Sequence, residues 1–258
     1  MRSLLLLLAS LLPLSAAADS ALPFMKDLAG DTQLPRPWGL SVDFYTMNQD
    51  YEIADLQFLL PGVSLGDPSA LDVTNDVQHF DIKADVWLFP FLNVFGIAGR
   101  VDAETVVDFS NADIVGLPFD LGTLPVSYDG TVLGLGFTLA VGSESWFASA
   151  TTTFTKTDTS GDLDSTVDSL SIQPRIGIIR SSWLFWVGGM YLDVDEQHSG
   201  IFELPFIGGV PFSVDLVTKD TWNWTVGTSY NFSDRANFSF EYGFGDRTHT
   251  LASFNYRF

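Results

Sequence analysis

The feature that most constrains the fold is a strict period-two alternation in the last part of the chain. Between 222 and 258, large apolar residues alternate with small polar ones in three successive segments. Such alternation predicts β-strands with two chemically different faces. The apolar faces are formed by Trp222, Trp224, Val226, Thr228, Tyr230 and Phe232, by Ala236, Phe238, Phe240, Tyr242 and Phe244, and by Thr250, Ala252, Phe254, Tyr256 and Phe258. Three consecutive strands therefore share one design.

Alternation alone fits both a soluble β-sandwich, whose apolar faces pack together, and a membrane barrel, whose apolar face meets lipid. Two features favour the barrel. The apolar faces become aromatic near the strand ends, as interfacial girdles do. The opposite faces are rich in Gly, Ser, Thr and Asn, which suits a narrow polar lumen. The expected girdle residues are Trp38, Phe89, Trp183, Trp186, Phe254 and the terminal Phe258.

Further candidate strands lie upstream, and the connections between them alternate in length. The candidates are 38–47, 77–89, 92–107, 128–141, 145–156, 166–180 and 183–195, which with the last three give about ten strands. Long connections occupy 48–76, 109–127 and 196–219, and the others are short. Bacterial barrels have short periplasmic turns and longer outer loops. The sequence therefore predicts an all-β, up-and-down transmembrane antiparallel β-barrel over 37–258.

The N-terminus has the features of a secretory signal peptide. Arg2 supplies a positive charge, residues 4–12 are almost entirely apolar, and residues 15–18 offer a small-residue cleavage site. The apolar run stops at Pro13, short of the roughly 20 residues that a spanning helix needs. We expect 1–18 to be a cleaved signal peptide and 19–36 to be a periplasmic lead-in to the barrel.

The whole chain resembles the small bacterial outer-membrane β-barrel proteins, a broad class that includes the OmpA-type and OmpW-type barrels. The resemblance is carried by the signal peptide, the strand pattern and the terminal Asn255-Tyr256-Arg257-Phe258. It implies a location in the outer membrane of a Gram-negative cell, insertion by the barrel-assembly machinery, and lipopolysaccharide and other outer-membrane lipid as neighbours. It implies no functional residues.

Strand parity predicts a charged interior. The residues assigned to the lumen are His79, Asp81, Lys83, Asp85, Arg100, Asp102, Glu104, Arg175, Glu241, His249 and Arg257. Two interpretations use the same residues. They form a satisfied ion-pair network in a narrow barrel, because buried charges must be paired, or they line a constricted, porin-like conduit and set its ion preference.

The long connections carry a weak internal repeat that is apolar. Leu117-Pro118-Phe119, followed by Pro125, recurs as Leu204-Pro205-Phe206, followed by Pro211. Exposed apolar patches are rarely left uncovered. These segments are therefore expected to fold into an apolar cap over the barrel, to line an access site for a small hydrophobic solute, or to form a patch that faces another surface.

Composition and motifs narrow the function. A net charge of −20 argues against nucleic acid as a partner, because phosphate binding needs clustered Lys and Arg. No motif for a cofactor or a metal is present, and none is expected. Asp193, Asp195 and His198, with Asp81 and Asp85, loosely resemble the site of omptin proteases. A lipid hydrolase of the G-x-S-x-G type lacks its motif.

We therefore expect a non-enzymatic barrel that passively takes up or binds a small, hydrophobic solute. A non-conducting structural or surface-interaction barrel is the alternative, and an outer-membrane hydrolase is the third hypothesis. A continuous water path would favour the first, a sealed lumen the second, and a His–carboxylate pair in an outer cleft the third.

Overall fold

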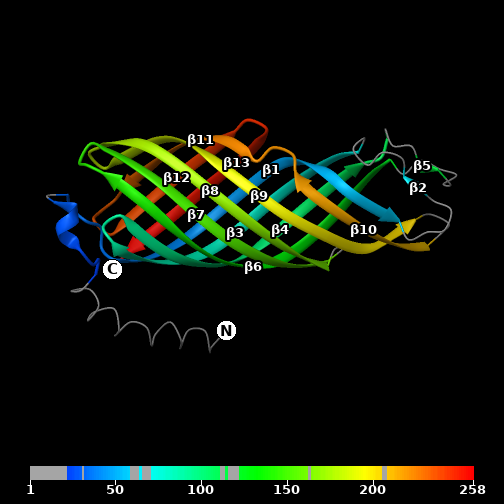
Figure 1. Cartoon of the computed structure of the whole chain (residues 1–258), viewed down its shortest axis with the longest axis horizontal. Coiled ribbons are helices and arrows are strands. Elements are labelled where there is room, and N and C mark those ends of the chain that lie inside the picture. The colour runs from blue at the N-terminus through cyan, green and yellow to red at the C-terminus, as the bar shows by residue number, and fades with distance from the viewer. Residues whose placement is uncertain are drawn as a thin grey trace, which may run out of the picture.

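The computed structural model describes residues 22–30, 32–58, 64–65, 71–110, 114–115, 122–161, 164–204 and 208–258. Ten antiparallel strands form a closed ring (Figure 1). They are β1 (Trp38–Phe58), β3 (Asp72–Phe89), β4 (Leu92–Asp108), β6 (Thr123–Gly142), β7 (Trp146–Gly161), β8 (Asp164–Arg180), β9 (Trp183–Leu204), β11 (Trp222–Asn231), β12 (Ala236–Phe244) and β13 (Arg247–Arg257). Strand β1 closes the ring by pairing with both β13 and β3. The predicted fold class and strand number are confirmed.

One further strand changes the shape of the barrel. Strand β10 (Gly208–Thr218) pairs with the far part of β9 on one side and with the far part of β1 on the other. It takes the place of β11, β12 and β13, which end lower down. Beyond the tip of the β12–β13 hairpin, the wall is therefore an eight-stranded ring, which we call the outer extension. A separate pair, β2 (Ser64–Leu65) with β5 (Ile114–Val115), lies near it (Figure 1).

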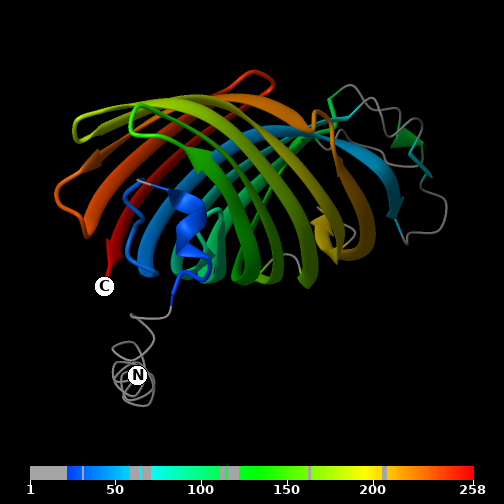
Figure 2. The same ribbon diagram turned by 60° about the vertical axis from the view of Figure 1, so that its left-hand side comes forward.

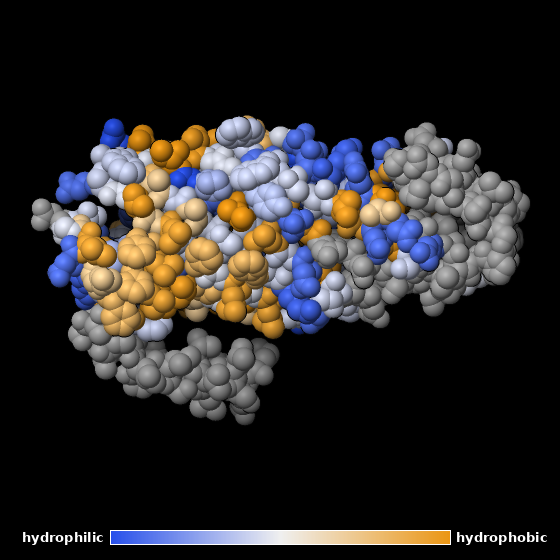
Figure 3. Space-filling view, in the orientation of Figure 1, coloured by the Kyte–Doolittle hydropathy of each residue, from blue (hydrophilic) through white to orange (hydrophobic). Residues whose placement is uncertain are grey.

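The outward face of the barrel carries an apolar band. Many large apolar side chains on it are between two-fifths and seven-tenths exposed, among them Val42, Phe44, Phe80, Ile82, Leu133, Leu135, Phe154, Ile176, Val187, Trp224, Phe240 and Phe254. Figure 3 shows apolar residues gathered over the half of the barrel with the short turns, and hydrophilic ones further along. A band of this size is expected only where lipid covers it.

The chain before β1 lies against the short-turn end of the barrel. It contains one 3₁₀ turn, η1 (Lys26–Ala29), which sits at the same end as the C-terminus (Figure 2). The amide of Phe24 donates to the carbonyl of Leu88 at 2.8 Å, and Arg36 pairs with Asp234 at 3.3 Å. Among the described residues, no helix has the length and apolar character to cross a membrane. The predicted signal peptide lies outside the described residues.

The strands run further than the sequence predicted. The connection expected at 48–76 contains the end of β1 and the start of β3, and the loop expected at 196–219 is largely the β9–β10 hairpin. That third loop prediction is therefore corrected. The reason is that polar and apolar residues still alternate beyond the membrane, but there the polar residues face outward and the apolar ones inward. A prediction that requires an apolar outer face therefore ends each strand too early.

The predicted apolar cap is not tested by the described residues. Leu117, Pro118, Phe119, Pro205 and Phe206 lie outside them. Leu204 ends β9 and Pro211 belongs to β10, where they appear as backbone partners of Gly208 and Ile201.

Candidate functional site in the barrel lumen

The barrel encloses a cavity of about 610 Å³ lined by all ten strands of the ring. At the short-turn end its lining includes Asn231 and Asn237, and at the other end Tyr51 and Tyr128. The cavity therefore extends through the membrane-spanning part of the barrel and into the base of the outer extension. Its walls differ in chemistry.

The wall formed by β13, β1 and β3 carries paired charges. Lys83 on β3 donates to Asp43 on β1 at 2.9 Å, and the Ser253 hydroxyl on β13 donates to the same carboxylate. Nearer the short turns, Arg257 bonds to Asp85 at 2.6 Å. Lys83 and Arg257 each have a carboxylate partner, so their charges are compensated locally, and Asp81 lies 3.1 Å from His79.

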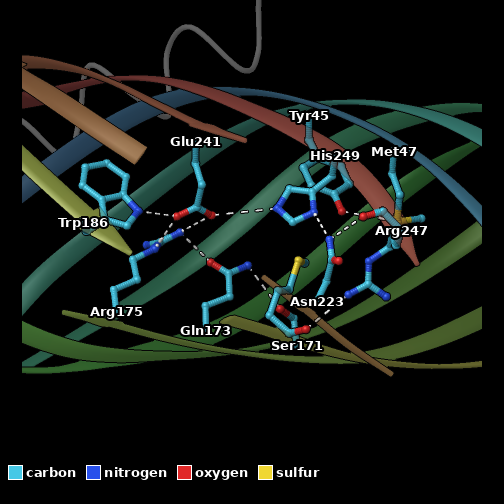
Figure 4. Close-up of polar contacts among 11 residues, drawn as sticks. Tyr45, Met47, Ser171, Gln173, Arg175, Trp186, Asn223, Glu241, Arg247 and His249 are labelled. Atoms are coloured by element: carbon cyan, nitrogen blue, oxygen red, sulfur yellow. Dashed lines mark hydrogen bonds and ion pairs between the residues drawn. The ribbon is translucent and has the colours of Figure 1, made fainter. Parts of the chain in front are cut away.

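A second charged cluster joins β8, β9 and β12 (Figure 4). Arg175 donates to both oxygens of Glu241, at 2.7 and 2.9 Å, the bidentate arrangement that is strongest for this pair. The indole of Trp186 donates to Glu241 at 2.5 Å, and His249 lies 4.0 Å away on the other side. Glu241 is only 2% exposed. The side chain of Gln173 accepts another bond from Arg175 at 2.8 Å.

Arg247 fills the junction at which the wall narrows from ten strands to eight. It is 2% exposed, and it donates to Gln49 on β1, to the carbonyl of Met190 on β9 and to that of Asp220 before β11, at 3.3 to 3.5 Å. The Asn223 amide donates to the carbonyl of Arg247 at 2.5 Å. This one guanidinium therefore ties together the strands that meet below β10.

The wall formed by β7 and by the part of β8 that precedes Gln173 is lined by neutral hydroxyl groups. Thr155 and Ser169 are 2.5 Å apart, and Thr138 on β6 reaches Thr151 at 3.0 Å. The hydroxyl-bearing residues that line the cavity here are Thr138, Ser149, Thr151, Thr153, Thr155, Thr157, Thr159, Ser169 and Ser171. A rotating hydroxyl can donate or accept, so this wall can serve many uncharged polar groups.

Above these walls the interior becomes apolar. Met47, Leu192 and Val194 form a buried cluster with Val77 and Val167 against it, which we call the apolar belt. Beyond it, inside the outer extension, lies a second cluster that we call the outer plug, made of Tyr51, Ile53, Leu71, Val73, Phe109 and Leu216. The outer extension thus has a packed core of its own, like a small water-soluble barrel.

Glycines on the inner face make room for the large side chains of the lumen. A methyl group at Gly227 would lie 2.2 Å from the Trp186 ring, and one at Gly99 would lie 1.9 Å from an oxygen of Asp81. Each of these side chains lies flat over a glycine of the neighbouring strand. The glycines therefore keep bulky groups against the wall and the cavity open.

Most of the predicted lumen residues do line the cavity, namely His79, Asp81, Lys83, Asp85, Arg175, Glu241, His249 and Arg257. The assignment of Arg100, Asp102 and Glu104 was wrong, because these side chains are exposed on the outer face of β4. In register, Arg100 lies beside the outward Phe80, while Val101 lies beside the inward His79. These three residues are just beyond the apolar band, where the outside is polar and the inside is apolar.

Three residues of the charged clusters were missed or misplaced. Asp43 and Arg247 lie on the inner faces of their strands, and the parity that found His249 and Arg257 would have found them. Trp186 was assigned to the interfacial girdle, but it faces the lumen and bonds to Glu241. Its neighbours at 183 and 185 are aromatic too, so composition alone could not tell the two faces of β9 apart.

The omptin-like arrangement does not assemble. Asp193 is exposed on the outer face of β9, whereas Asp81 and Asp85 are buried in the lumen wall. The side chains of Asp195 and His198 lie outside the described ones. Because proton transfer requires hydrogen-bond reach, carboxylates on opposite sides of the wall cannot serve one site.

A closed antiparallel barrel with an apolar outer band and a polar lumen is the architecture of a bacterial outer-membrane protein. No family model matches the sequence, and no curated protein matches it. Among solved structures, the outer membrane protein OprG from Pseudomonas aeruginosa is similar in fold, with a TM-score of 0.50 and 10% identity over 88% of this chain and 99% of OprG.

Two other solved barrels align over most of their length with lower scores. The transport unit of the autotransporter AIDA-I from Escherichia coli gives a TM-score of 0.43 at 11% identity, over 95% of this chain and 96% of the other. The toluene transporter TodX from Pseudomonas putida gives 0.32 at 10% identity, over 93% and 91%. The likeness to OprG, at 10% identity, bears on the fold alone.

Proposed function

We propose that the barrel takes up or binds a small uncharged solute that has an apolar part and one or more polar groups. The observation that carries this proposal is the combination of a hydroxyl wall, a charge-compensated wall and an apolar belt around one cavity of about 610 Å³. Each surface has a distinct preference, and together they fit an amphipathic neutral molecule.

The pairing of the bases argues against an anion as the preferred solute. The cavity lining contains four Asp or Glu and three Lys or Arg residues, and each of the three bases has a carboxylate partner. The fourth carboxylate, Asp81, lies 3.1 Å from His79. An anion that leaves water for this cavity therefore meets no unpaired Lys or Arg among the lining residues, whereas a neutral solute has no comparable desolvation cost.

The hydroxyl wall and the apolar belt set the remaining preferences. Thr153, Thr155 and Ser169 can exchange hydrogen bonds with a hydroxyl, ether or carbonyl group. Leu192, Val194 and Met47 can cover a ring or short alkyl chain, and full burial of such a group is worth about 1.5–3 kcal/mol. A solute that satisfies both regions spans the cavity along the barrel axis.

The test is solute flux into vesicles that contain the barrel refolded from residues 19–258. Three small solutes are compared: an aryl glycoside, a hexose and an aryl sulfonate. The aryl glycoside is larger than the hexose, so faster entry of the glycoside would not be an effect of size. We expect the aryl glycoside to enter fastest and the sulfonate slowest. Faster entry of the sulfonate, or equal rates for all three, would contradict the proposal.

The second candidate is a non-conducting structural or surface-interaction barrel. The observation in its favour is the outer plug, whose six residues are at most 7% exposed and fill the interior of the outer extension. If vesicles with correctly folded protein admit none of the three solutes, this candidate replaces the first.

A further inference from the structure

A second concavity lies on the outside of the barrel, on the face of β12, β13, β1 and β3. It has a volume of about 210 Å³. Its lining consists of the outward residues Thr46, Asn48, Asp76, Gln78, Tyr242, Thr248 and Thr250 and of Met47, Val77 and His249, which also line the lumen cavity. We call it the outer groove. Its seven outward residues do not line the lumen cavity, and the groove plays no part in the proposed function.

Strand register explains how the groove forms. Tyr242, Thr250, Thr46 and Gln78 lie side by side in one row across the four strands, and Thr248, Asn48 and Asp76 form the next row outward. The larger Tyr242 and Gln78 stand at the two edges, and the small threonines lie between them. The difference in side-chain size therefore leaves a shallow groove over the threonines.

The groove sits directly above the apolar band. The row below it consists of Phe240, Ala252, Phe44 and Phe80. One step along the strands thus changes four apolar positions into four that carry hydroxyl or amide groups. The groove is on the side of the outer extension, which faces out of the cell in barrels of this kind. It is therefore level with the headgroups of the outer leaflet.

The chemistry of the groove fits a neutral sugar better than a phosphate. Three threonine hydroxyls and two amides offer both donors and acceptors, and the Asn48 amide donates to Asp76 at 2.9 Å. Among the described residues that border the groove, none is Lys or Arg, the side chains that bind phosphate. The half-exposed ring of Tyr242, 43% accessible, offers an apolar face to the carbon side of a sugar ring.

We propose that the outer groove binds the sugar headgroup of a glycolipid in the outer leaflet, with its acyl chain passing over Ala252. The small Ala252 leaves a track between Phe240 and Phe44, and this track leads from the lipid-facing band into the groove. Continuity with the membrane surface is what selects a lipid-linked sugar rather than a free saccharide.

The experiment measures lipid retention by native mass spectrometry of the refolded barrel, with a glycosyl diacylglycerol and phosphatidylglycerol as probes. The variants Tyr242→Ala and Thr46→Val/Thr250→Val remove the ring and two hydroxyls. Two lost hydrogen bonds predict about tenfold weaker glycolipid retention for the double variant. The matched control is Thr131→Val, an exposed outward threonine on β6 beside Arg100.

Selective loss of the glycolipid in both groove variants, with retention unchanged in the control, would support the proposal. Equal retention in all variants would overturn it, as would phosphatidylglycerol bound as tightly as the glycolipid. A free oligosaccharide that binds as strongly as the glycolipid would overturn the assignment to a lipid. Heat-modifiable mobility on gels verifies that each variant is folded.

Discussion

Replacement of Glu241 by Ala tests whether the lumen clusters are held by charge pairing. Glu241 accepts two bonds from Arg175 and one from the Trp186 indole. Removal of the carboxylate leaves a guanidinium and an indole N–H without that partner in the lumen wall. The unpaired charge, rather than the lost packing, is expected to dominate the effect.

The magnitude follows from burial. Breaking a buried ion pair by removal of one partner costs about 3–5 kcal/mol. The Arg175 side chain is 19% exposed and lines the cavity, so water can reach it and the lower end applies. We expect Glu241→Ala to lower the free energy of unfolding by about 3 kcal/mol, roughly a hundredfold in the folding equilibrium. The double variant Arg175→Met/Glu241→Leu leaves no unpaired charge, so its loss should be about 1 kcal/mol or less.

The assay is reversible urea unfolding in lipid vesicles, followed by heat-modifiable mobility. Asp234→Ala is the control, because its pair with Arg36 is 61% exposed on the carboxylate side and should contribute about 0.5 kcal/mol or less. If Glu241→Ala unfolds within 1 kcal/mol of the wild type, or if the double variant is as unstable as the single one, the reasoning about charge pairing is refuted.

Three further outcomes are expected. Gly227→Ala should displace Trp186 from the wall and reduce solute flux severalfold. Gly189→Ala is the control and should leave flux unchanged, because the nearest atoms to the added methyl group would be 3.4 Å away. Equal flux in both variants would contradict the role of Gly227. Arg247→Met leaves carbonyls below β10 without a donor and should destabilise by about 2 kcal/mol, with faster amide hydrogen exchange at the base of β10; unchanged exchange there would argue against a junction role. Leu192→Ser should lower aryl glycoside flux about fivefold without changing hexose flux, and an equal effect on both solutes would exclude the apolar belt as a selective element.

Much of the fold follows from the sequence because the membrane imposes a simple rule on it. Within the lipid, nearly all large outward side chains are apolar, so period two and parity together indicate the strands and their inner faces. This is why His79, Lys83, Arg175 and Glu241 could be placed in the lumen. The pairing of these residues could not be predicted, since it depends on strand register around a closed ring.

The residues that the sequence misplaces lie where the solvent changes. On β3, outward positions change from Phe80 and Ile82 to Gln78 and Asp76, while inward positions change from Asp81 to Val77 and Val73. The alternation keeps its period but exchanges its faces. On β4 the same exchange puts Val101 inside and Arg100 outside, so a rule written for lipid misassigned the charges.

The position at which the outward residues change from apolar to polar is itself informative. It can be located in each strand and then compared between neighbouring strands. On β1 the last outward apolar residue before the polar ones is Phe44, on β3 it is Phe80, and on β13 it is Ala252; all three fall in a single row of the sheet. Because the strands of a barrel tilt, the plane in which the solvent changes crosses successive strands at positions that shift along the sheet. On β4 the switch comes one outward position earlier, since Arg100 already lies beside Phe80. Locating the switch point in each strand would therefore have predicted the outer boundary of the membrane, and it would have separated the polar lumen from the packed core of the outer extension.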